Sequence, residues 1–172
     1  MNILETLLAS ARGGALGRAA ETRGLGTNDV QALLGQLVPA LTAQMTRNAS
    51  EDDGRGLASA LGRGNHARYL DDGATLASPE AVDDGNGILG HILGSKDASR
   101  ALAARAASNT GIDVGTIKQF LPVVAAATMG AMSKGTNGGQ SGLGGLLSQF
   151  LDSNRDGSVA DDLLSLGKKF LR

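Results

Sequence analysis

Apolar side chains recur every three or four residues along most of the chain, the spacing typical of α-helices with one buried face. The clearest stripe follows Thr27 and contains Val30, Leu33, Leu34, Leu37, Val38, Leu41 and Met45. At the start of the chain, Asn2 and Glu5 have the spacing of a capping box for a first helix. Val, Ile and aromatic residues do not alternate with polar residues for long, so strands are poorly supported. The pattern predicts an all-α, multi-helical fold.

The most apolar run of the sequence begins at Phe120 and ends at Met132. It is shorter than the roughly 20 residues that a membrane span needs. We therefore expect a buried helix around which the other helices pack, and no membrane span.

Glycine, proline and clusters of polar residues predict where helices end. Gly24 suits the end of a short second helix, and Pro39 should kink or divide the long stripe. Residues 50–55 are expected to form a polar loop, and residues 62–77 an irregular region. The run Asp83–Gly87 is expected to break the chain.

The order of these features repeats after residue 87, at nearly constant spacing. The matches pair Ile3 with Ile88, Leu4 with Leu89, Leu7 with Ile92, Leu8 with Leu93, Gly24 with Gly111 and Pro39 with Pro122. We interpret this as a duplication, with a first helical half over residues 1–86 and a second over 87–134, packed together as one domain. Chance similarity between helices rich in Ala, Leu and Gly is the alternative. A Gly-rich tether (135–145) and a C-terminal helix-loop-helix hairpin (146–172) are predicted to follow.

Composition narrows the candidate functions. A formal charge of −1 over 172 residues makes the chain as a whole a poor binder of polyanions. The absence of cysteine excludes disulfides, a thiol nucleophile and thiolate metal sites. The N-terminus shows no basic region followed by an apolar stretch and a cleavage site, so a cytoplasmic location is expected.

An acidic stretch near the end of the chain has the spacing of a calcium-binding loop. Asp152, Asn154 and Asp156 occupy positions 1, 3 and 5 of an EF-hand loop. Gly157 fits the sharp turn at position 6, and Ser158 would offer its backbone carbonyl at position 7. Helical patterns flank the loop, as this motif requires.

The loop departs from the EF-hand pattern at position 12, where Leu163 replaces the bidentate glutamate. An aspartate one or two residues earlier would have to supply that oxygen in a shifted geometry. The alternative is a polar turn whose Asp161 caps the last helix. The candidate ligands of this single calcium site are Asp152, Asn154, Asp156, Ser158, Asp161 and Asp162.

The last helix of the predicted hairpin is amphipathic with a basic end. Its apolar residues are Leu163, Leu164, Leu166, Phe170 and Leu171, and its basic residues are Lys168, Lys169 and Arg172. We expect it to pack on the core or on a partner, because it is short for a membrane-surface helix.

Two further patterns favour structural roles. The spacing of Ala107, Gly111, Ile112 and Ile117 resembles the turn of a helix-turn-helix motif, but the second helix offers only Lys118 and Gln119 before it turns apolar. The histidines, His66 and His91, are too few for a metal site, so we interpret both as structural. His66 precedes Tyr69 and the pair Asp71 and Asp72, with which it could form a small polar cluster.

Several runs resemble the bacterial domain-of-unknown-function family numbered 937, which includes YidB-like proteins. The runs are Asp84 to Asp97, Gly111 to Asp113, Lys118 to Pro122, His66 to Asp72, and Asp156 to Ser158. The resemblance covers most of the chain. It implies an all-helical fold and no particular activity or catalytic residue.

No Ser-His-Asp spacing, phosphate loop or dinucleotide fingerprint is present in the sequence. We therefore expect a non-enzymatic interaction or scaffolding protein, which binds an unknown protein partner or itself and takes calcium in the C-terminal loop. The alternative is a nucleic-acid-binding regulator that uses the helix-turn-helix-like segment, although the missing basic face makes nucleic acid an unfavourable partner.

Overall fold

A computed structural model of the chain describes residues 3–51, 55–63 and 65–135, and these form α-helices and one 3-10 helix, with no strand among them. The all-α prediction is therefore confirmed. The predicted Asn2 cap, the tether beyond Gly135 and the hairpin over 146–172 lie outside the described residues. The elements are α1 (Ile3–Ala11), α2 (Ala15–Glu21), α3 (Thr27–Glu51), α4 (Arg55–Arg63), the 3-10 helix η1 (His66–Leu70), α5 (Gly73–Ala77), α6 (Pro79–Leu93), α7 (Lys96–Thr110) and α8 (Val114–Gly135).

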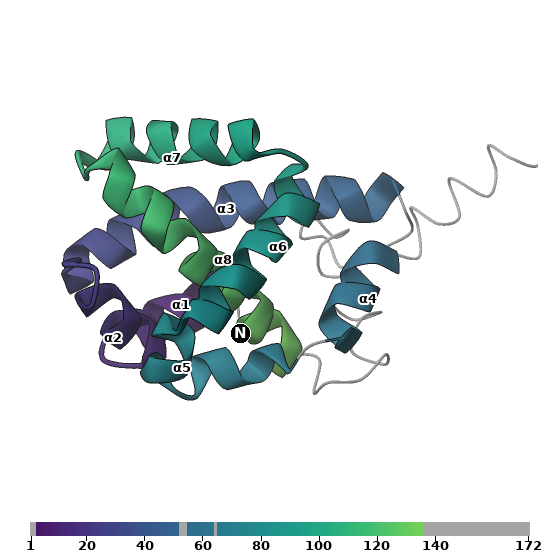
Figure 1. Cartoon of the computed structure of the whole chain (residues 1–172), viewed down its shortest axis with the longest axis horizontal. Coiled ribbons are helices and arrows are strands. Elements are labelled where there is room, and N and C mark those ends of the chain that lie inside the picture. Colours follow the sequence, from purple (N-terminus) through teal and green to yellow (C-terminus); the bar gives the residue numbers. More distant parts are fainter. Residues whose placement is uncertain (1–2, 52–54, 64, 136–172) are drawn as a thin grey trace, which may run out of the picture.

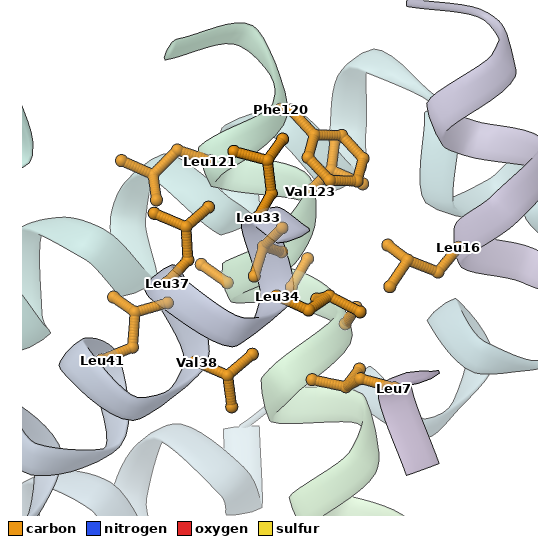
Figure 2. Packing of buried hydrophobic residues seen from close by; sticks show 14 of the residues in the cluster. Leu7, Leu16, Leu33, Leu34, Leu37, Val38, Leu41, Phe120, Leu121 and Val123 are labelled. Carbon is orange, nitrogen blue, oxygen red and sulfur yellow. The ribbon is translucent and has the colours of Figure 1, made fainter. Parts of the chain in front are cut away.

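Helix α8 runs through the middle of the bundle, and the other helices surround it (Figure 1). Its side chains are buried without interruption from Phe120 to Ser133, as the apolar run predicted. Figure 2 shows α3 presenting Leu33, Leu34 and Leu37 to the part of α8 that carries Phe120 and Val123. The predicted stripe on α3 is buried from Val30 to Met45, so that prediction is also confirmed.

Within the described part of the chain, α8 is also the one helix long and apolar enough to cross a membrane by length and composition. Of its most apolar window, 72% is already buried inside the protein. A helix packed in this way behaves as the core helix of a bundle, so it gives no clear membrane span.

Helix α3 continues through Pro39 and is not divided. Pro39 lies on the exposed side of the helix, where water can satisfy the carbonyl that a proline leaves without its helical partner. The helix also continues as far as Glu51, so the polar loop predicted from residue 50 begins too early.

The predicted break at Asp83–Gly87 is wrong, because α6 passes through these residues without interruption. A Cβ added to Gly85 would lie 2.0 Å from the carbonyl oxygen of Pro122. Gly85 therefore serves as a contact point at which the backbones of α6 and α8 touch. The predicted boundary between residues 86 and 87 falls inside this helix.

The region 62–77, predicted to be irregular, contains the end of α4, η1 and α5. The carboxylate of Asp72 caps α5 by accepting hydrogen bonds from the backbone N–H groups of Ala74 and Thr75. The Thr75 hydroxyl and these N–H groups lower the pKa of Asp72. Tyr69 and Leu76 are fully buried, which holds the segment against the core.

Features of the proposed duplication recur in the structure, but the duplication itself stays a prediction. Gly24 has φ 73° and Gly111 has φ 74°, and each precedes a long helix with an internal proline. The helices before these glycines differ in length, with 7 residues in α2 and 15 in α7.

We predict that Gly85→Ala destabilises the protein by about 3 kcal/mol, at the upper end of overpacking effects, because the new methyl group meets backbone atoms that cannot rotate away. Gly90→Ala on the same helix is the matched control, since a Cβ there meets nothing within 4 Å. It should stabilise by up to about 1 kcal/mol through helix propensity. Chemical denaturation followed by circular dichroism measures both, and equal stabilities for the two variants would contradict the proposed close contact.

Candidate functional site

A pocket with a volume of about 500 Å³ lies between α3, α4, η1, α6 and α8. In Figure 1 these elements meet at the end of the molecule where α4 lies beyond α6. We call it the acidic pocket. Its lining residues are Met45, Asn48, Ala49, Gly56, Ser59, Ala60, His66, Asp83, Asp84, Gly87, Ile88, His91, Ile92 and Met129.

The lining combines an apolar surface with two carboxylates. Met45, Met129, Ile88 and Ile92 are each at least nine-tenths buried and supply the apolar part. Asp83 and Asp84 supply the two carboxylates, and no lysine or arginine is found in the part of the lining that the structure describes. An apolar pocket with a few polar groups at defined positions is the usual form of a binding site.

Helices α3 and α6, which both line the pocket, are joined by hydrogen bonds at the end of α6. The Asn48 side chain on α3 donates to the carbonyl oxygens of His91 at 3.0 Å and Ile92 at 2.9 Å. Gln44, one turn earlier on α3, donates to the Asn48 side-chain oxygen at 3.1 Å and orients it. Asn48 thus satisfies carbonyl groups that the end of a helix leaves without intrahelical partners.

A polar cluster behind the pocket centres on Tyr69. The Tyr69 hydroxyl donates to the Asp84 carboxylate, and Arg68 donates to the Tyr69 oxygen at 3.2 Å. Arg68 also pairs with Glu80 on α6 at 2.7 Å. The guanidinium lies 5.0 Å from the centre of the Tyr69 ring, within the range of a cation–π interaction.

The protonation of this cluster follows from its surroundings. Burial raises the pKa of the Tyr69 phenol, the Asp84 carboxylate raises it further, and Arg68 opposes the shift. Hydrogen bonds with Tyr69 and Glu80 raise the pKa of Arg68. At neutral pH the Tyr69 phenol therefore keeps its proton and donates a hydrogen bond. This bond holds the Asp84 carboxylate of the pocket in place.

Of the predicted cluster of His66 with Tyr69, Asp71 and Asp72, the ring contact between His66 and Tyr69 forms, with centroids 6.1 Å apart, but both aspartates have other partners. Asp71 pairs with Lys134 on α8, and Asp72 caps α5, while Tyr69 takes its acidic partner from α6. Local spacing does not indicate this partner, because Asp84 is 15 positions away from Tyr69.

The structure brings the two histidines to the same pocket, which spacing did not predict. His66 is buried, and its Nε2 lies 3.1 Å from the Ala60 carbonyl oxygen on α4. Its Nδ1 has no hydrogen-bond partner in the part of the chain that the structure describes. His91 is exposed and lines the pocket from α6. Among the described residues, no group of three His, Asp or Glu side chains could hold a metal ion.

The predicted calcium ligands Asp152, Asn154, Asp156, Ser158, Asp161 and Asp162 lie outside the described residues. The helix-turn-helix-like segment lies within them. Asp113 caps the start of α8 by accepting a hydrogen bond from the Thr116 backbone N–H at 2.9 Å. Lys118 and Gln119 are exposed, but α8 is buried from Phe120 onwards, which leaves little of it for a DNA groove.

The fold and the acidic pocket define an all-helical bundle that carries a carboxylate-rimmed apolar pocket on its surface. A comparison with protein families matches residues 5–135, from α1 to the end of α8, to the family described as bacterial protein of unknown function, DUF937. The chain belongs to this family. No curated protein and no solved structure matches the chain.

The titration of Tyr69 tests the polar cluster. Tyr69 is the one tyrosine of the chain, which has no tryptophan, so absorbance near 295 nm reports this phenol alone. In the urea-unfolded chain the titration midpoint of Tyr69 should lie near the ordinary tyrosine value of about 10. We expect the midpoint of the folded chain to lie above it. Because the folded pKa is the higher one, the associated stability is complete below about pH 10 and is lost as the pH rises through the folded value.

The variants for this test are neighbours on α6. Asp84→Asn should lower the midpoint toward the unfolded value, because it removes the negative charge beside the phenol. Asp83→Asn should leave the midpoint nearly unchanged, since the Tyr69 hydroxyl donates to the carboxylate of Asp84 and not to that of Asp83. Identical midpoints for the folded and unfolded wild-type chain would refute the described cluster.

Proposed function

We propose that this protein is a non-enzymatic interaction module whose acidic pocket receives apolar side chains from a basic amphipathic helix of a protein partner. The observation that carries the proposal is the lining of the pocket, which is apolar inside and carries two carboxylates. The size of the pocket, the flexible methionine side chains in its lining and the charge expected on its two aspartates all support this proposal.

Pocket size supports insertion of side chains rather than a whole helix. A volume of about 500 Å³ accommodates one or two large apolar side chains. A helix lying across the opening would insert such residues as anchors at a spacing of three or four, as amphipathic helices do in hydrophobic grooves.

Two of the lining residues are methionines, Met45 from α3 and Met129 from α8. Methionine is unbranched and polarizable, so it adapts its shape to different apolar partners. The two residues also come from the two longest helices of the described chain, so the adaptable surface rests on a rigid support.

The carboxylates determine which charge the partner carries. Asp83 and Asp84 line the pocket and are exposed, and the lining residues that the structure describes include no lysine or arginine. Complementary charge at a rim mainly increases the association rate and selects against the wrong partner. A partner with lysine or arginine beside its apolar anchors satisfies both parts of the pocket.

The contacts of the titratable groups support a binding role rather than catalysis. In the described part of the pocket, His66 contacts a backbone carbonyl and Asp84 contacts Tyr69. A catalytic site for acyl or phosphoryl transfer brings a nucleophile and a base into mutual contact. These side chains instead hold the walls of the pocket together.

A model peptide tests the interaction. A labelled amphipathic peptide of leucine and lysine should bind the full-length chain, and the same peptide with glutamate in place of lysine should not. Asp83→Lys should weaken binding about fivefold to tenfold, the effect of losing one favourable exposed pair and adding a repulsive one. Fluorescence anisotropy at moderate salt measures these affinities.

The matched control for this charge reversal is Asp97→Lys, an exposed aspartate on α7 outside the pocket. It changes the net charge by the same amount and should leave the affinity within about twofold. Equal weakening by the two substitutions would mean that the peptide responds to overall charge and not to the pocket.

We also propose that the loop containing Asp152, Asn154 and Asp156 binds one calcium ion. Its missing position-12 glutamate should make the site weaker than the about 10⁻⁷–10⁻⁵ M of sensor loops. Calorimetric titration with calcium should show one site per chain, and Asp156→Ala should abolish it, whereas Asp97→Ala should not. A wild-type chain that takes up no calcium at millimolar concentration would remove this part of the proposal.

A further inference from the structure

We propose that the acidic pocket is occupied by the C-terminal segment of this same chain, residues 163–172. The inference rests on the proposed function, because it names an occupant for the same pocket. The occupant is intramolecular, so a protein partner must displace it before binding.

The segment has the chemistry that the pocket selects. An α-helix turns by about 100° per residue. In a helix formed by this segment, the leucines and the phenylalanine would fall on one half and the polar residues on the opposite half. The apolar half contains Leu163, Leu164, Leu166, Phe170 and Leu171, and the polar half contains Ser165, Lys168, Lys169 and Arg172. Phe170 and Leu166 are four positions apart, the spacing of two anchors that enter the same pocket.

The charges of the two surfaces are complementary. The segment carries three basic residues, Lys168, Lys169 and Arg172, and no acidic residue after Asp162. The described lining of the pocket carries Asp83 and Asp84 and neither lysine nor arginine. A helix with its apolar side toward Met45 and Met129 would therefore bring its lysines to a rim of opposite charge.

The described chain ends beside the pocket. Met129 lines the pocket, and a Cβ added to Gly130 would lie 2.7 Å from the carbonyl oxygen of His66, another lining residue. Gly135, the last residue of α8, follows Met129 by about 9 Å along the helix axis. Lys134 pairs with Asp71 directly after η1, which fixes this end of α8 against the element that carries His66.

The intervening chain is long enough to return to the pocket. Residues 136–162 separate the end of α8 from Leu163, and a helical segment of that length spans about 40 Å, more than the diameter of a small domain. A tethered segment of this kind has a local concentration near the millimolar range, so even a weak contact is largely formed.

Paired cysteines test the inference, since the chain has no cysteine of its own. The test pair is Ser59→Cys on α4, which lines the pocket, with Gly167→Cys, which falls on the apolar half of the segment. The control pair keeps Gly167→Cys and adds Ser108→Cys on α7, which is exposed and outside the pocket. Disulfide formation in the full-length chain is followed in a redox buffer, with each rate corrected for the reactivity of the single cysteines toward a small reagent.

We expect the pair with Ser59→Cys to close within one molecule at least tenfold faster than the control pair, and Phe170→Glu to remove this advantage. Equal rates for the two pairs would overturn the inference. A disulfide that forms mainly between two molecules would also overturn it and would indicate that the segment of one copy enters the pocket of another.

The leucine–lysine peptide separates this inference from the proposed function. If the segment occupies the pocket, Phe170→Glu should bind the peptide at least fivefold more tightly than the wild-type chain. If both chains bind it equally and Asp83→Lys weakens both, the pocket is a binding site but the segment does not occupy it. If neither chain binds the peptide, the proposed function fails.

Discussion

The backbone contact between α6 and α8 at Gly85 and Pro122 sets the position of the elements that form the pocket. With no side chain between the two backbones, α6 lies against α8 so closely that Ile88 and Ile92 on its next turns are buried beside the core helix. The same placement brings Asp84 to Tyr69 on η1. Gly130 repeats the arrangement against η1, where the carbonyl of His66 takes the space of a side chain. A glycine inside a helix costs about 1 kcal/mol in helix propensity, and close packing offsets this cost.

The parts of the fold that depend on local spacing could be predicted from the sequence. The stripe from Val30 to Met45 identifies a helix because burial and a period near 3.6 residues are both properties of the segment itself. The course of α6 could not be predicted in this way. Asp83–Gly87 is a turn-like sequence, and its helical state depends on Pro122, a residue of another helix. Tertiary packing here overrides local propensity.

The candidate site was less predictable than the fold. His66 and His91 seemed unrelated, since nothing in their spacing indicates a shared pocket. Asp71 and Asp72 seemed the natural partners of the His66 region, yet Asp72 is used as a helix cap and Asp71 pairs with Lys134. The walls of this pocket come from separate elements, so its shape depends on how the helices pack against one another. Residue spacing within one helix carries no information about that packing. Asp83 and Asp84 fall in the run that was predicted to break the chain, so their place on the pocket side of a helix was not foreseen either.

Helix α4 forms one wall of the pocket, and Ala60 and Leu61 are its described side chains that pack against the core. Its described side chains are exposed or half-buried, whereas α8 is buried along most of its length. Local opening of a protein costs least where few apolar side chains are buried. On the side chains that the structure describes, we expect α4 to detach at a lower free-energy cost than α8. The width of the acidic pocket would then be a thermal average over states of this wall, and a bulky guest would select the wider states while the central helix stays in place.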